Sequence, residues 1–370
     1  MLERRLSAGT PSPATVPGPP TYYPPEVETP TNPTFAWVFL SLVWGSTWLF
    51  IKLGLEDLPP FSFAGIRFVI ALVPLGLVLA LRRQRLPRCR RDWAMVALTG
   101  VLLFTVDYGL IFWGERHLTC GLTAVLFSTT PLFGLLFAHR LVPDERLTPR
   151  MLLGVVVGIG GVVVIYAHQL HQEDPLAPIA SLAITAAAAS AALSNTLVKA
   201  HLTHLEPLVV TAGQMTVGVV PLLALGLATE GNPAAFDWTP LALASLVYLA
   251  LVGSTLSFLL FYRLVRSVAV TRVQLLILVN TLVAVLLGWI VLGETLGVRG
   301  LVGTAAVLGG LGICFWAPRR APRGARLAPA QGCPELRLAP PSPVPELAPG
   351  CRLDPGGHPS GSTCQPSRRG

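Results

Sequence analysis

Ten long apolar segments, separated by short connections, constrain this chain more than any other feature. A helix needs about 20 apolar residues to cross the roughly 30 Å hydrocarbon core of a bilayer. Within lipid, each backbone polar group has to be bonded inside its own segment. The sequence therefore predicts an all-α membrane protein with ten transmembrane helices. They are expected at 35–54, 60–81, 93–113, 119–138, 149–167, 178–198, 207–228, 239–262, 269–292 and 299–317.

The charge content of the chain agrees with a lipid environment. Charged residues make up 12% of the chain and hydrophobic residues 52%, whereas a soluble domain carries about 25% charged residues. So little charge cannot cover a water-facing surface. The net charge of +8 gathers in short connections, which is typical of membrane orientation and argues against nucleic-acid binding.

The basic residues predict the orientation. The connection RRQRLPRCRR at 82–91 and the later connections on the same side carry most of the arginines, while the opposite connections hold only Arg116 and Arg299. The positive-inside rule places both termini in the cytoplasm. We therefore expect a multi-pass protein of the cell membrane, either the plasma membrane or an inner membrane.

The two ends of the chain differ from the segments between them. Residues 1–33 and 318–370 hold 21 of the 34 prolines, so they cannot bury a core and are expected to be disordered. The predicted parts are a Pro-rich cytoplasmic tail at 1–33, a first five-helix repeat at 34–167, a connecting loop at 168–177, a second five-helix repeat at 178–317 and a Pro/Arg-rich cytoplasmic tail at 318–370.

An internal repeat relates the two halves. Prolines, charges and glycines recur in the same order at offsets of 147 and then 149 residues. The matched pairs are Lys52 and Lys199, Pro60 and Pro207, Pro74 and Pro221, Glu145 and Glu294, Arg150 and Arg299, and Gly160-Gly161 and Gly309-Gly310. Five helices are an odd number, so the second half runs in the opposite sense through the membrane. Inverted repeats are a common plan of secondary transporters, with the substrate near the bilayer midplane between the halves.

Several segments resemble a known family. WGSTWLFIKLG (44–54), LPPFSFAGIRF (58–68) and TAVLFSTTPLFGLLFA (123–138) are similar to the first, second and fourth helices of an EamA-type domain of the drug/metabolite transporter superfamily. PDERLTPRMLLGVVVGIGGVVVI (143–165) and GETLGVRGLVGTAAVLGGLGI (293–313) resemble its closing elements in the two halves. The resemblance implies that helices one to four and six to nine surround a central cavity. It also implies that helices five and ten are peripheral and could form a homodimer.

Apart from arginines in the first turns of three segments, the predicted spans hold three charged side chains. Lys52 lies near a span end, from which its ammonium group can reach water. Arg67 and Asp107 lie about 10 and 9 Å deep at 1.5 Å per residue. Because their helices are consecutive and their depths match, we expect the two charges to meet. They would form either a permanent structural pair or a gate or ion-binding pair that breaks in one state.

Aromatic and small polar residues are candidates for the lining of the cavity, because such walls bind a solute that is partly polar and partly apolar. Interhelical packing is the alternative for each of them. With the two charges, the predicted site is Trp44, Ser46, Thr47, Trp48, Arg67, Asp107, Tyr108, Phe127, Thr130, Pro131, Asn195, Gln214, Ser257, Tyr262 and Asn280.

Pro131 removes a backbone hydrogen bond, so it either kinks its helix or frees a carbonyl for a ligand. Glu145 and Glu294 precede helices and are interpreted as structural, since a carboxylate there complements the helix dipole. The glycines of the fifth and tenth segments let helices approach closely, either within the chain or across a dimer. Neither the six cysteines nor the histidine pairs have the spacing of a metal site. The cysteines assigned to cytoplasmic segments are expected to be reduced.

The sequence thus predicts a secondary-active transporter. We expect an exporter of amino acids or small metabolites that works by alternating access, driven by a proton gradient or by solute exchange. A passive channel, a lipid scramblase and a membrane scaffold stay open as alternatives. An enzyme is not expected, because no nucleophile triad, nucleotide loop or zinc motif occurs. The expected partners are a small-molecule substrate and the lipid bilayer, without a cofactor, a metal or nucleic acid.

Overall fold

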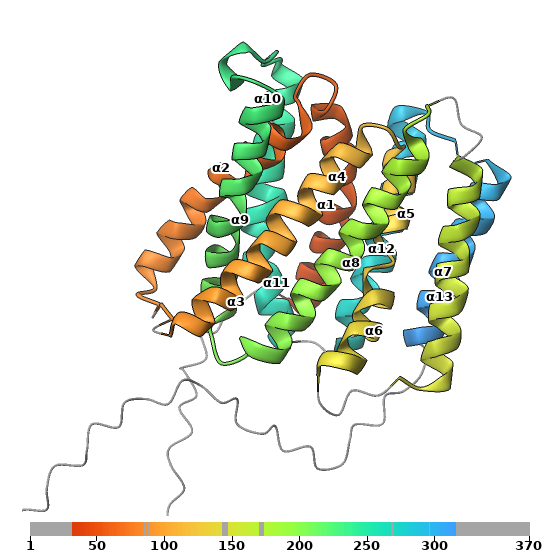
Figure 1. Ribbon diagram of the computed structural model, residues 1–370, viewed down its shortest axis with the longest axis horizontal. Helices are drawn as coiled ribbons and strands as arrows, with labels where there is room; N and C mark the ends of the chain where they lie inside the picture. Colours follow the sequence, from red (N-terminus) through yellow and green to blue (C-terminus); the bar gives the residue numbers. More distant parts are fainter. Residues whose placement is uncertain are drawn as a thin grey trace, which may run out of the picture.

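The computed structural model describes residues 32–84, 86–87, 89–142, 147–169, 174–267, 270–295 and 297–315. Helices joined by short connections make up these ranges (Figure 1). The first half contains α1 (Pro33–Gly54), α2 (Pro60–Leu81), α3 (Arg90–Gly100), η1 (Val101–Asp107), α4 (Tyr108–Glu115), α5 (Cys120–Phe127), α6 (Thr130–Leu141) and α7 (Pro149–Gln169). The second half contains α8 (Ala177–His201), α9 (Pro207–Thr229), η2 (Pro233–Ala235), α10 (Pro240–Val247), η3 (Tyr248–Leu256), α11 (Ser257–Ser267), α12 (Val270–Leu292) and α13 (Val298–Phe315).

Seven helical stretches of the described residues are long and apolar enough to cross a membrane: 33–54, 60–81, 90–115, 120–141, 177–201, 207–229 and 240–261. Three shorter apolar helices, at 149–165, 279–292 and 298–314, overlap the fifth, ninth and tenth predicted segments. The chain is therefore an all-α membrane protein. Residues 1–31 of the first tail, the whole second tail, Glu145 and the side chain of Tyr262 lie outside the part of the chain that the structure describes.

Two helical stretches contain a π-helical segment at matching positions. η1 begins at Val101 and η3 at Tyr248, 147 positions apart. In η3 the hydroxyl of Ser254 donates to the Leu249 carbonyl at 3.0 Å, five residues back. π-helical turns are rare in proteins, so their recurrence at the repeat offset is evidence of duplicated halves. The apolar pattern alone predicted two uninterrupted α-helices here.

The stretch 120–141 breaks at Ser128 and Thr129, directly before Pro131. Pro131 cannot donate to the Phe127 carbonyl, and the Thr130 hydroxyl donates to that carbonyl instead, at 2.6 Å. Ser128 and Thr129 donate in the same way to Val125 and Leu126, both at 2.7 Å. The helix is interrupted next to Pro131, and the carbonyl that Pro131 frees is bonded within the chain.

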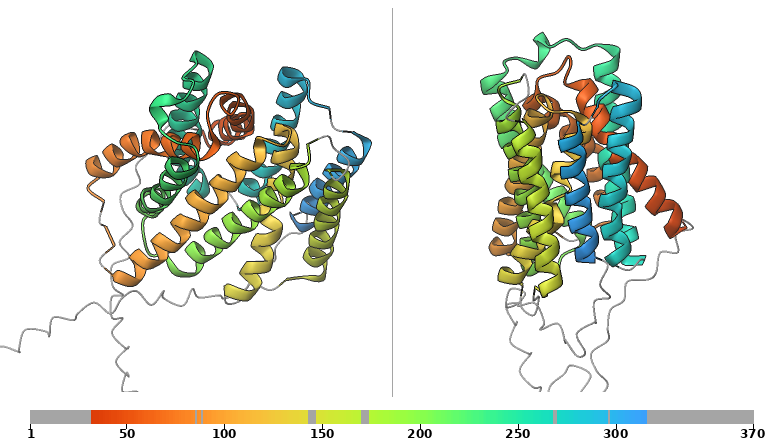
Figure 2. Two further views of the ribbon diagram at one scale, coloured as in Figure 1. Left: turned by 45° about the horizontal axis from the view of Figure 1, so that its top comes forward. Right: turned by 90° about the vertical axis from the view of Figure 1, so that its right-hand side faces the viewer.

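α7 and α13 pack against each other at one edge of the helical body (Figures 1 and 2). A Cβ atom added at Gly154 would lie 2.6 Å from the Gly310 carbonyl oxygen, and one at Gly161 would lie 2.7 Å from that of Gly303. Only glycine permits so close an approach. The glycine faces of both helices are therefore used within this chain.

Aromatic side chains join α2 to the neighbouring stretch 90–115 in the core. The ring of Phe68 lies edge-on to that of Phe104 at 5.0 Å, and the ring of Phe63 edge-on to that of Phe112 at 5.2 Å. These four phenylalanines are among the largest fully buried side chains.

Cys89 is disulfide-bonded, so the expectation that all cysteines of cytoplasmic segments are reduced is wrong at this position. That expectation came from the redox state of a compartment and used no information about distances. Cys120 and Cys314 are free and buried.

Candidate functional site

Arg67 lies on α2 at the interface between the two halves. Its side chain is 3% exposed, and its Nε donates to the Ser254 hydroxyl of η3 at 3.2 Å. The rings of Phe68, Tyr108 and Phe112 surround its guanidinium carbon at 5.0, 5.4 and 5.8 Å from their centroids. Aromatic faces attract a cation. Its Nη1 is buried without a hydrogen-bond partner.

The expected pair of Arg67 and Asp107 is not formed. Among the described residues no ion pair joins them, and Oδ1 of Asp107 is buried without a partner. The depth estimate assumed that consecutive helices face each other at this level. Instead, η3 packs against α2 and η1 packs against α9. Arg67 therefore meets Ser254, which occupies the repeat position of Asp107.

Gln214 on α9 is the repeat counterpart of Arg67. It is 4% exposed, and its Nε2 is buried without a partner. Because α9 packs against η1, the helices that carry Gln214 and Asp107 are neighbours. Both halves therefore contribute polar atoms without a hydrogen-bond partner to the interface between them.

The predicted residues of α1 face other elements of the bundle. The Ser46 hydroxyl shares a hydrogen bond with the Tyr248 hydroxyl at 2.6 Å, and the rings of Trp48 and Phe127 lie 5.4 Å apart. Trp44 packs against Phe261 at 5.1 Å.

α1 also approaches α12. With its amide nitrogen facing carbonyl oxygens, Asn280 of α12 donates to the carbonyls of Ser41 and Leu276, each at 3.0 Å. The first and second halves therefore meet along α1 as well as along α2.

Other predicted residues do not donate hydrogen bonds across the interface between the halves. The hydroxyls of Thr47, Thr130 and Ser257 donate to carbonyls of their own helical stretches. Tyr108 packs edge-on to Phe68 at 4.6 Å. Asn195 is exposed on α8. In this conformation, only part of the predicted set has polar groups directed at another element.

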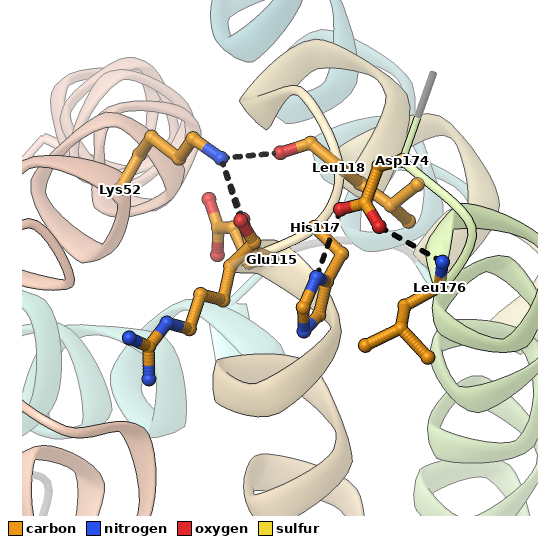
Figure 3. Close-up of polar contacts among 7 residues, drawn as sticks. Lys52, Glu115, His117, Leu118, Asp174 and Leu176 are labelled. Atoms are coloured by element: carbon orange, nitrogen blue, oxygen red, sulfur yellow. Dashed lines mark hydrogen bonds and ion pairs between the residues drawn. The ribbon is translucent and has the colours of Figure 1, made fainter. Parts of the chain in front are cut away.

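A second polar cluster lies at the end of the bundle where α1 joins α2, α4 joins α5 and α9 joins α10. We call it the polar end; it comprises Lys52, Asp57, Glu115, Glu230, Thr239 and Glu294. The Lys52 ammonium donates to the backbone carbonyls of Glu115 and Leu118 at 2.8 and 2.7 Å (Figure 3). Lys52 therefore ties α1 to the α4–α5 connection, where the sequence suggested that it extends to water.

Two glutamates of the second half cap helices of the first half at the polar end. Glu230 accepts from the backbone N–H groups of Phe61 and Ser62 at the start of α2, both at 2.7 Å. Glu294 accepts from those of Cys120 and Gly121 at the start of α5, at 2.7 and 3.1 Å. Glu294 is structural as predicted, but it caps a helix of the other half and not the helix that follows it in sequence.

Two further contacts close this end. The Thr239 hydroxyl donates to the Asp57 carboxylate at 2.5 Å. The His117 ring contacts Asp174 at 2.9 Å, and the Leu176 N–H donates to the same carboxylate at 2.8 Å (Figure 3). The Leu176 N–H and the His117 ring hold the pKa of Asp174 below its ordinary value.

Sequence reasoning missed Ser254 and Tyr248 at the interface between the halves, and Asp57, Glu115, Glu230 and Thr239 at the polar end. Ser254 could have been found by adding the repeat offset of 147 to Asp107. Glu115 follows the predicted third span by two residues, so the span estimate was too short there. Nothing in the sequence pattern distinguished Tyr248 from an interfacial tyrosine.

Comparisons with known proteins agree with this architecture. The "Uncharacterized transporter YoaV" of Bacillus subtilis is 25% identical over 274 residues, covering 74% of this chain and 93% of that protein. The "Uncharacterized inner membrane transporter YedA" of Escherichia coli is 30% identical over 269 residues, covering 71% of this chain and 84% of that protein. A "Probable terminal-alkyne amino-acid exporter" of Streptantibioticus cattleyicolor is 29% identical over 279 residues, covering 75% and 91%.

A solved crystal structure that is 19% identical superposes with a TM-score of 0.54, covering 78% of this chain and 99% of that one. This likeness bears on the fold alone. The family model for the EamA-like transporter family matches residues 33–167 and again 178–316. Two matches in tandem account for the duplicated halves, and a transporter family agrees with the prediction that the chain is not an enzyme. The chain is a membrane transporter that belongs to the EamA-like transporter family.

Proposed function

We propose that this transporter is a secondary-active exporter of amino acids or related small metabolites that works by alternating access. The observation that carries the proposal is Arg67, a buried guanidinium at the interface between the halves with Nη1 unbonded. A guanidinium binds carboxylate through paired hydrogen bonds. The surrounding rings of Phe68, Tyr108 and Phe112 suit an apolar side chain. An amino acid combines both features.

A relative supports this substrate class, because one of the similar proteins carries the name of a probable amino-acid exporter. The neutral counterpart of Arg67 in the second half is Gln214. The two halves therefore offer different chemistry at equivalent positions, which suits an asymmetric solute. The other predicted cavity residues, Ser46, Trp48 and Asn280 among them, are proposed to line the path in a more open conformation.

The proposed arrangement has ten spans in two inverted repeats, one at 34–167 and the other at 178–317. Both termini lie in the cytoplasm, and the transporter lies in the plasma membrane or an inner membrane. The seven long and three short apolar helices support ten spans. The arginines of 82–91 support the orientation. With that orientation the polar end faces outward, and its contacts between the halves correspond to a conformation closed to the outside.

A homodimer through α7 and α13 would need faces other than the glycine faces, because these already pack against each other in one chain. A passive channel or lipid scramblase is the second candidate function, and a scaffold the third. The carboxylates that cap helices across the halves at the polar end favour a closed state, which a passive pore does not need.

Counterflow in proteoliposomes tests the proposal. Vesicles loaded with a mixture of unlabelled amino acids should accumulate a radiolabelled amino acid transiently and saturably. Arg67→Gln should reduce the initial rate of this uptake at least about tenfold, because the substrate carboxylate loses its charged partner. Ser254→Ala is the matched control, because it removes one hydrogen bond of Arg67 and keeps the charge. Flux that is linear in concentration, without counterflow, would identify a channel instead.

A further inference from the structure

Glu115 is a buried carboxyl group with no bonding partner. It ends α4 at the polar end, is 0% exposed, and neither of its carboxyl oxygens has a hydrogen-bond partner. The nearby Lys52 ammonium is not bonded to this carboxylate. It donates to the backbone carbonyls of Glu115 and Leu118 at 2.8 and 2.7 Å.

Among the described residues, three charged side chains of other elements act on Glu115. Lys52 comes from α1, Arg67 from α2, and Glu294 from the residues that follow α12. On α5, the thiol of Cys120 is influenced by Glu115, Glu294 and Lys52 together, and Tyr108 shares α4. Lys52 and Arg67 attract a carboxylate at this position, whereas Glu294 repels it. Its charge therefore depends on how tightly the polar end is closed.

Burial decides this balance in the closed conformation. An ionised carboxylate that is removed from water without a hydrogen bond costs so much that the group takes up a proton instead. In an open conformation, water would reach Glu115, and Lys52 would be free to leave its two carbonyls. Asp107 is buried as well, but among the described residues no ion pair joins it to a side chain of another element.

We propose that Glu115 is a proton-binding site, and that closure of the polar end takes up one proton from water on that side. The carboxylate of Glu115 and one proton give the neutral carboxyl group. The proposal rests on the proposed function in one respect, because it requires that the polar end opens and closes. It names the proton as the ion whose binding accompanies that step.

Hydrogen bonding separates Glu115 from the other carboxylates of the polar end. Glu230 and Glu294 each accept two backbone N–H groups in the closed conformation. Glu115 accepts none, so its neutral form is the one that can be buried. With one proton bound per closure, the ratio of closed to open molecules should rise up to about tenfold for each unit by which pH falls within the titration range.

The test measures the distance between two spin labels on the full-length protein in lipid nanodiscs. Glu56→Cys and Ala234→Cys place the labels at exposed positions of opposite halves, beside the Asp57–Thr239 contact, with the other cysteines replaced by serine. The short-distance population should grow as pH falls. In Glu115→Gln it should dominate at all pH values, because the amide mimics the protonated carboxyl group. Glu115→Asp should keep the pH dependence.

Glu230→Gln is the matched control: it should lower the short-distance population at each pH and leave its pH dependence intact. Glu115→Met, with a neutral side chain of similar volume, repeats the test if the glutamine variant does not fold. A wild-type distance that does not change with pH, a change of opposite sign, or a Glu115→Gln variant that titrates like wild type would each overturn the proposal. The distance measurement uses no substrate. If counterflow were not observed while the distances still changed with pH, the proposed exporter function would be rejected and the proposed proton site would stand.

Discussion

Arg67 and Asp107 were expected to pair, but no ion pair joins them. Arg67 meets Ser254 across the interface between the halves, while an oxygen of Asp107 stays unbonded. Charge inside a membrane protein is costly unless it has a function or a partner. The incomplete bonding of Arg67 is therefore the residue-scale feature that most needs a functional explanation.

The absence of an ion pair between these residues leads to a prediction about stability. Arg67→Gln and Asp107→Asn should change the free energy of unfolding additively, within about 0.5 kcal/mol, because neither change removes an ion pair with the other residue. Thermal unfolding of the two single variants and the double variant in detergent would check this. A double variant that recovers most of the stability lost by either single change would show that the two side chains pair in solution.

At the scale of helices, much followed from the sequence. The apolar segments and Pro131 predicted where helices run and where one breaks, because hydropathy and a missing N–H act locally. The π-helical turns of η1 and η3 were not predictable from hydropathy, since they change hydrogen bonding by one residue within a uniformly apolar stretch. The cap that Glu294 provides for α5 depends on how the halves pack, which no local pattern records.

That cap gives a prediction for the start of α5. Glu294→Ala removes the acceptor of the Cys120 and Gly121 N–H groups, and losing an N-terminal cap costs about 0.5–2 kcal/mol. The polar end should open more often, so a membrane-impermeant maleimide should modify the buried thiol of Cys120 several-fold faster. Glu56→Ala, at an exposed position of the same end, should leave that rate unchanged. Equal rates in all three proteins would show that Glu294 does not hold this end closed.

The packing of α7 on α13 can be tested at adjacent glycines. A Cβ at Gly161 would lie 2.7 Å from the Gly303 carbonyl oxygen, while one at Gly160 would meet nothing within 4 Å. Gly161→Ala should destabilise the protein by about 1–3 kcal/mol, as overpacking does. Gly160→Ala should be neutral or stabilising by up to about 1 kcal/mol, because alanine favours helix. Melting temperatures of the two variants give the answer, and a reversal of this order would mean that the α7–α13 contact is different in the membrane.

The whole molecule consists of two halves that share a plan and differ in their polar groups. The tandem family matches and the recurrence of the π-helical segment at one offset account for the shared plan. Arg67 against Gln214 and Asp107 against Ser254 are differences that the sequence already displayed. The packing of η1 against α9 and of η3 against α2 determines which of these residues meet. This packing exists only once the two halves have assembled.

The orientation of the whole chain is open to a direct experiment. A reporter that is active only in the cytoplasm should be active when fused at residue 330 and silent when inserted near residue 172, since the arginine-rich connections lie on the side of the tails. Activity in cells is the readout, with immunoblots to equalise expression. The reverse pattern would place the polar end in the cytoplasm and invert the proposed direction of transport.

The π-helical segments also limit which insertions and deletions the chain can accept. Equivalent residues of the two halves are 147 positions apart from Lys52 and Lys199 as far as η1 and η3. Further along the chain, at Glu145 and Glu294, they are 149 positions apart. Removing one residue from η1 would restore ordinary helical bonding and turn the whole of α4 by about 100°. Glu115 would then face away from Lys52. Length changes between the duplicated halves are therefore expected to accumulate in the stretch beyond these segments, while η1 and η3 keep a fixed residue count in related chains.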